Sequence, residues 1–109
     1  MVEKILLVQG DTRPAIVCTL LDEVTQQPIN LTGATPRLHF RESGYITILT
    51  SVVGSVTDAV NGVCVFYPAS APEMLGGFGN FEGEIEITFA DGQIQTVYEL
   101  LKFKVRQEF

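Results

Sequence analysis

The chain has 109 residues, 46% of them hydrophobic and 18% charged, and thirteen acidic against seven basic residues give a net charge of −6. This length predicts one domain, residues 1–109, with a modest core. The negative charge repels phosphate backbones and anionic lipid heads, which argues against nucleic acid and membrane surfaces as partners. The low share of charged residues predicts a surface that contacts other subunits.

The N-terminus and the cysteines indicate the compartment. No run approaches the roughly 20 apolar residues of a membrane span, and Met1-Val2-Glu3-Lys4 does not open a secretory signal. We therefore expect a chain kept in the cytoplasm or in a particle assembled there. Cys18 and Cys64 lie in apolar runs without metal or redox spacing, so we expect two free, core-filling thiols, with a disulfide as the minor alternative.

The first half of the chain reads as short strands. Residues 4–9 are a first apolar strand that ends in a turn at Gly10. Residues 15–21 are so continuously apolar that they suit a central strand covered on both faces, or one near a subunit contact. After a polar connection through Pro28, residues 35–41 alternate apolar and basic side chains and predict a third strand with a basic outer face.

The middle of the chain is less regular. The β-branched run at residues 45–50 predicts a fourth strand, and residues 51–61 hold one more short strand before the Asn61-Gly62 turn. Residues 63–67 are the next strand, ended by Pro68. The only helical character is at residues 68–75, where one or two turns would have Ser70 as the N-cap.

Residues 81–89 predict the strand around which the chain is organised. Apolar residues and glycine alternate there with Glu82, Glu84, Glu86 and Thr88, as in a strand with one buried face. Asp91-Gly92 then predicts a tight reversal into residues 94–98. A last long strand covers residues 97–105.

Seven or eight short strands with almost no helix predict an all-β fold, an immunoglobulin-like antiparallel β-sandwich. If residues 35–41 pair with residues 81–89, Arg37 and Arg41 face the glutamate row across the sheet. We expect such ion pairs to fix the register, because a slip by one residue would turn Ile85 and Ile87 outward.

We expect no catalytic, cofactor or metal site. His39 is the only histidine, and Arg37 and Arg41 on its face oppose imidazolium formation, so we interpret it as a solvated side chain of the sheet. Same-face residues on a strand are about 7 Å apart, too far for neighbouring glutamates to hold one cation. The glycines at residues 76–79 precede a strand and lack a lysine, which favours a flexible loop over a phosphate loop.

Several short motifs follow one another along nearly the whole chain. They are Gly10-Asp11-Thr12, Asn30-Leu31-Thr32-Gly33-Ala34, Asn61-Gly62-Val63, the glycine-rich residues 76–80, Phe81-Glu82-Gly83-Glu84 and Ala90-Asp91-Gly92. In this order they resemble the N-terminal domain of phage baseplate upper proteins, and the box at residues 30–34 is the most characteristic part.

This resemblance implies an assembly module of a tailed-phage virion without catalytic residues. Because the sequence ends at Phe109, shortly after the last predicted strand, we expect a stand-alone module without the fibre-holding part of long members. We expect a structural protein, not an enzyme: a tail or baseplate adaptor, a head–tail joining protein or a decoration protein. Its partners would be other virion proteins and further copies of itself. It would be assembled into the virion in the host cytoplasm.

The alternative is a carbohydrate-binding module that attaches the particle to a host surface glycan. It would require an exposed aromatic platform, for which the candidates are Tyr45, Tyr67, Phe78 and Tyr98. The absence of tryptophan, and an alternation that turns most aromatic residues inward, argue against such a platform.

Overall fold

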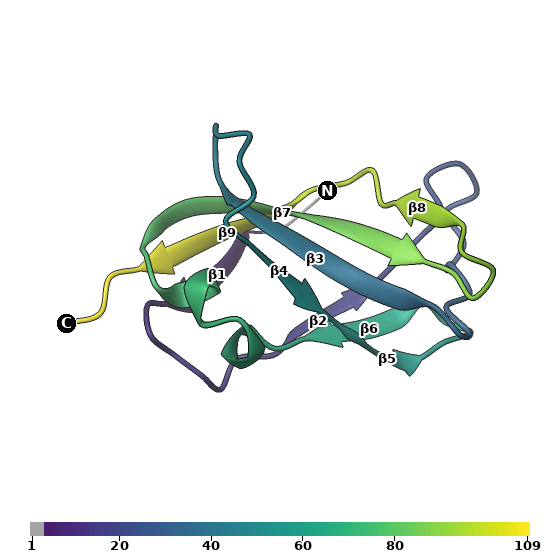
Figure 1. Cartoon of the computed structure of the whole chain (residues 1–109), viewed down its shortest axis with the longest axis horizontal. Helices are drawn as coiled ribbons and strands as arrows, with labels where there is room; N and C mark the ends of the chain where they lie inside the picture. The colour runs from purple at the N-terminus through teal and green to yellow at the C-terminus, as the bar shows by residue number, and fades with distance from the viewer. Residues whose placement is uncertain (1–3) are drawn as a thin grey trace.

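The structure is a computed structural model that describes residues 4–109 and consists of two β-sheets packed face to face (Figure 1). The strands are β1 (Lys4–Val8), β2 (Ile16–Thr19), β3 (Thr35–Glu42), β4 (Thr50–Val53), β5 (Ser55–Asp58), β6 (Val63–Phe66), β7 (Gly79–Thr88), β8 (Ile94–Thr96) and β9 (Leu101–Arg106). Two 3-10 turns, η1 (Pro68–Ser70) and η2 (Pro72–Leu75), precede β7. The helical turns between residues 4 and 109 are too short to cross a membrane.

β7 is the central strand of the larger sheet, whose order is β1-β9-β7-β3-β4. It pairs antiparallel with β3 from Thr35 to Glu42, so the predicted pairing of these two strands is confirmed. On its other side, β9 pairs with the first half of β7 and β8 with the second half. The predicted hairpin is the β7–β8 pair, and the positive φ of Gly92 lies in its loop.

The predicted inner and outer faces of β7 are confirmed. Ile85 and Ile87 are buried in the core. Next to them, the ring of Phe40 on β3 stacks on Phe81 with centroids 4.9 Å apart and meets Phe103 of β9 edge-on at 5.2 Å. Because side chains alternate along a strand, this inner position of β7 places the glutamates between them on the opposite face.

The smaller sheet has the order β2-β6-β5 and covers the same core. The chain passes from the larger sheet to the smaller one at Gly54, between β4 and β5. A Cβ atom on Gly54 would lie 2.6 Å from Cε1 of Phe66, so the crossing requires glycine. Met74 and Leu75 of η2 are also buried and close the core near the start of β7.

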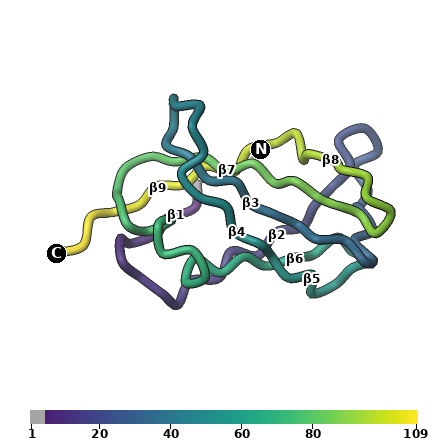
Figure 2. The backbone as a smooth tube through the Cα atoms, viewed as in Figure 1, coloured from purple at the N-terminus to yellow at the C-terminus, as the bar shows by residue number. Residues whose placement is uncertain are grey.

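Several predicted elements have different bounds. Residues 4–109 form nine strands rather than seven or eight, because residues 51–61 contain parts of two strands that belong to different sheets. The strand predicted at residues 45–50 begins only at Thr50, and residues 43–49 form a loop that stands out from the sheet (Figure 2). The strand predicted at residues 97–105 begins at Leu101.

Three further predictions are wrong in detail. β2 is an edge strand with Val17 exposed, not a central strand covered on both faces. β1 and β9 are parallel, although the other strand pairs are antiparallel. Ser70 does not cap a helix, because its hydroxyl donates to the carbonyl oxygen of Tyr67. The predicted absence of a secretory signal rests partly on residues 1–3, which lie outside the described part of the chain.

Candidate interaction surface

The outer face of the larger sheet carries most of the candidate polar residues. Neighbouring strands β3, β7 and β9 place their charged side chains there in cross-strand register, with Arg41 opposite Glu82 and Glu82 opposite Lys102. The regular pairing over eight residues of β3 and β7 holds these side chains in rows. The chemistry of this face therefore follows from the register of three strands.

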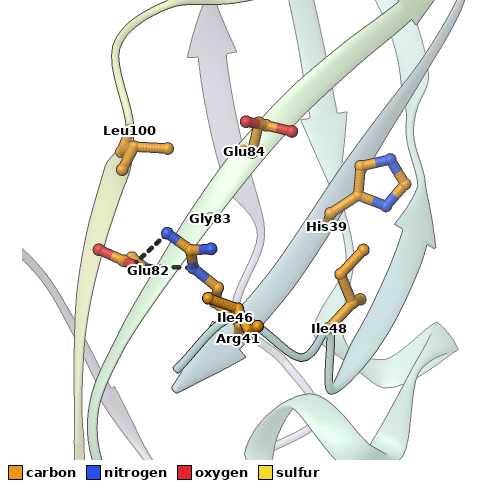
Figure 3. Close-up of a pocket in the computed structure, with 8 residues that line it drawn as sticks. All are labelled: His39, Arg41, Ile46, Ile48, Glu82, Gly83, Glu84 and Leu100. Atoms are coloured by element: carbon orange, nitrogen blue, oxygen red, sulfur yellow. Dashed lines mark hydrogen bonds and ion pairs between the residues drawn. The ribbon is translucent and has the colours of Figure 1, made fainter. Parts of the chain in front are cut away.

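Glu82 is the centre of an ion-pair network. Arg41 donates from Nε and Nη2 to the Oε1 atom of Glu82 at 2.8 and 2.7 Å (Figure 3). Lys102 Nζ donates to Oε2 of Glu82 at 2.9 Å. Glu82 is only 8% exposed. The hydrogen bond from Lys102 is the largest cause that lowers the pKa of Glu82, followed by the bond from Arg41, although burial acts in the opposite direction. Glu82 is therefore a charged, structurally fixed residue.

The second predicted ion pair does not form. Arg37 lies opposite Glu86 in the ladder, but its Nη1 atom donates to the hydroxyl of Thr88 at 3.4 Å. Glu86 instead lies 3.7 Å from Nε2 of His39. The Arg41 pair is thus confirmed, and the Arg37 pair is replaced by a diagonal contact with His39.

His39 also contacts Ser51, which the sequence did not point to. Nδ1 of His39 lies 2.7 Å from Oγ of Ser51, so serine, histidine and Glu86 follow one another across three strands. Ser51 lies inside the regular strand β4 on an exposed face, not on a sharp turn that presents a nucleophile. The 3.7 Å separation from Glu86 also exceeds hydrogen-bond length. The row resembles a hydrolase triad in composition only.

A shallow hollow of about 150 Å³ lies beside this network. Its floor is formed by His39, Arg41 and the β7 residues, while Ile46, Ile48 and Leu100 form apolar walls (Figure 3). Ile46 is 89% exposed, so the loop at residues 43–49 adds apolar surface next to charged groups. A mixture of apolar walls and fixed charges suits contact with another protein.

The described residues offer no group of three metal-ligating side chains. Gly76 and Gly77 lie between η2 and β7, which begins at Gly79, so a strand follows this glycine-rich segment, as predicted. Cys18 and Cys64 lie opposite each other on β2 and β6 as free thiols, which confirms the prediction. Burial raises the pKa of Cys18 to about 11; burial, followed by the Cys18 charge, raises that of Cys64 to about 12. Both thiols are therefore neutral and unreactive at pH 7.

The tyrosines are more exposed than the alternation predicted. Tyr45, Tyr67 and Tyr98 are all exposed, and so is Phe78. The three tyrosines come from three separate segments: the loop before β4, the residue after β6 and the connection between β8 and β9. Exposure alone therefore does not assemble them into one stacking platform.

Comparison with known proteins identifies a likeness of fold. No protein-family model and no curated protein sequence matches the chain. Among solved structures, the chain is similar to the N-terminal domain of phage TP901-1 ORF48, with a TM-score of 0.67 and 18% sequence identity. The match covers 98% of this chain and 86% of the other. At this identity the likeness concerns the fold, which is that of a domain from a phage protein.

Proposed function

We propose that the chain is a structural virion protein of a tailed phage or prophage, acting as a small tail or baseplate adaptor, a head–tail joining protein or a decoration protein. The observation that carries this proposal is the near-complete overlap of the fold with a phage domain. The motif order along the sequence, which resembles the N-terminal domain of baseplate upper proteins, points the same way.

The surface supports a role in assembly. The loop at residues 43–49 contains no charged residue and presents Tyr45, Ile46, Ile48 and Leu49 to solvent. Exposed apolar clusters on a folded domain mark contacts with other proteins. The two-sheet architecture also leaves edge strands β1, β4, β2 and β5, whose free backbone groups can pair with another chain.

The direct test is to purify particles from an induced host on a density gradient and to search them for this chain by mass spectrometry. We expect the chain to co-purify at a constant ratio to the major tail or head proteins, and immunogold labelling to locate it on the particle. Intact particles that lack the chain would contradict the proposal.

A second experiment tests the contact surface. Ile46→Asp combined with Ile48→Asp should abolish binding to the purified virion partner, because both side chains are exposed and the loop lies outside the core. The matched control is Val60→Asp, an exposed apolar residue on a different loop. If the control weakens binding as much as the loop variant, the loop is not the contact.

The carbohydrate-binding alternative is favoured only by the exposure of the tyrosines. A glycan array with single replacements of Tyr45, Tyr67 and Tyr98 distinguishes it from the assembly role. We expect no specific glycan signal, whereas a signal lost in one tyrosine variant would support glycan binding.

A further inference from the structure

The outer edge of β2 has no partner strand among residues 4–109, because the smaller sheet ends there. In the β2–β6 register, Cys18 lies opposite Cys64, and the amide of Leu20 donates to Gly62 on the same side. Backbone groups of successive residues point to opposite edges of a strand. Val17 and Thr19 therefore direct their amides and carbonyl groups away from β6. Each copy of the chain offers two donors and two acceptors along this edge.

A hollow lies beside the same edge. The larger sheet has six strands and the smaller one three, so the smaller sheet leaves part of the inner face of the larger sheet uncovered. The hollow has a volume of about 350 Å³, and its walls include β2, the apolar residues Ile5, Ile85, Val97 and Leu101, and the acidic residues Glu23 and Glu99. Ile5, Val97 and Leu101 are only partly buried. A strand added beside β2 would cover them.

The sequence of β2 suits pairing with a second copy of itself. Residues 15–21 contain no charged side chain, so no charge blocks this edge. Arg13 is the first charged residue before this stretch, and Asp22 and Glu23 are the first after it. Antiparallel pairing of two copies brings the Arg13 end of one to the Asp22–Glu23 end of the other. Parallel pairing would instead place like charges together.

We propose that two copies of this chain pair through β2 in an antiparallel, two-fold symmetric contact. The contact joins the two three-stranded sheets into one continuous sheet of six strands. Val17 of each copy exchanges both backbone hydrogen bonds with Thr19 of the other, and Cys18 lies on the two-fold axis. The β2 strand of each copy then lies over the hollow of the other. Because both copies use the same edge, the assembly closes at a dimer.

The first test measures self-association of the full chain by sedimentation velocity over a dilution series. We expect a monomer–dimer equilibrium without larger species. The dimer should persist between 0.1 and 1 M salt, because backbone hydrogen bonds and apolar contacts are not screened as surface charges are. A chain that stays monomeric at every concentration would overturn the contact. The contact does not depend on the proposed function, and a monomeric chain found in purified virions would leave that function intact.

Proline variants identify the edge. Val17→Pro removes an amide that points away from β6, and proline is tolerated on edge strands at such positions. We expect the dimer to weaken at least about tenfold, because the loss occurs twice in a symmetric contact. The matched control is Val53→Pro on the edge strand β4, since the amide of the next residue, Gly54, donates to Pro36 of β3 and that of Val53 points away. Circular dichroism verifies folding. Equal weakening by the control, or none by Val17→Pro, would contradict the proposal.

Disulfide cross-linking tests the register. We compare Val17→Cys with Thr19→Cys, each combined with Cys18→Ala so that the neighbouring native thiol cannot react. Positions 17 and 19 of opposite copies have Cα atoms about 5.5 Å apart in this register, within reach of a disulfide. Identical positions lie on a diagonal about 7 to 8 Å apart.

In oxidised glutathione, an equimolar mixture of the two variants should therefore form a covalent dimer on a non-reducing gel, whereas each variant alone should not. Both changes are at exposed positions, so folding is preserved. A mixture that cross-links no better than either variant alone would overturn the proposed pairing.

Discussion

Glu82 is the outer-face residue whose charge is most closely coupled to folding. Glu82→Gln keeps the shape of the side chain but removes the charge that binds Arg41 and Lys102. We expect the free energy of unfolding at pH 7 to fall by about 1 to 3 kcal/mol, measured by urea denaturation. The control is Glu84→Gln, because Glu84 is exposed and makes no ion pair among the described residues. A control effect above about 0.5 kcal/mol would contradict this assignment.

The same residue gives the stability a defined pH dependence. Because the pKa of Glu82 is lower in the folded chain, its stabilising contribution is complete above the unfolded pKa of about 4.3. That contribution is lost as the pH falls through the folded pKa. The stability difference between the natural chain and Glu82→Gln should therefore shrink below about pH 4. A difference that stays constant through this range would show that the network does not lower the pKa.

Glu84 and Ile85 test the assignment of the two faces of β7. Glu84 points outward and is exposed, whereas Ile85 is 2% exposed in the core. Glu84→Lys should change the free energy of unfolding by no more than about 1 kcal/mol. Ile85→Asp should prevent folding, because an unpaired charge would be buried. Circular dichroism shows whether each variant folds. If both variants fold equally well, the assignment of the two faces of β7 is wrong.

The strand predicted at residues 45–50 is a loop up to Leu49 in the structure. Its residues are typical of a strand, but β propensity describes packing on a half-buried sheet surface and not a preference of the backbone alone. The amide of Leu49 donates to Phe40, and the β3–β4 register ends at Phe40 and Thr50, so Arg41 and Glu42 pair with β7 on one edge and have no β4 partner on the other. With no ladder to continue, the segment leaves the sheet. A local sequence pattern does not show whether a neighbouring strand is present for a segment to pair with.

The crossing between the sheets at Gly54 gives a prediction about an element boundary. Gly54→Ala should lower the free energy of unfolding by about 1 to 3 kcal/mol, because the new methyl group would overlap the Phe66 ring. Gly76→Ala is the control, since its nearest atoms are 3.6 Å away and its backbone is right-handed helical. Thermal denaturation measures the stability of the Gly54→Ala and Gly76→Ala variants. Similar stability of both variants would mean that the crossing adapts to a side chain.

At the scale of the whole molecule, local sequence patterns predicted only some of the strand pairings. The alternation of apolar and polar residues was sufficient to predict the strands β3 and β7, their pairing and therefore the Arg41–Glu82 ion pair. Lys102 was not foreseen as a partner of Glu82, because its position depends on β9 pairing with the first half of β7. Ser51 was not foreseen beside His39, because the register of β4 depends on where the loop ends. Long-range strand pairings of this kind, including the parallel β1–β9 pair, are set by packing of the complete core.

That shared core predicts how the molecule unfolds. Buried residues of both sheets and of η2 belong to one contiguous cluster, and the chain crosses from one sheet to the other at Gly54. Neither sheet can bury its inner face without the other, so we expect a single cooperative transition, as for one domain. Scanning calorimetry should give an unfolding enthalpy of roughly 75 kcal/mol near 60 °C. The calorimetric and van't Hoff enthalpies should agree. Two separate transitions, or a calorimetric enthalpy well above the van't Hoff value, would show that the two sheets unfold as independent units.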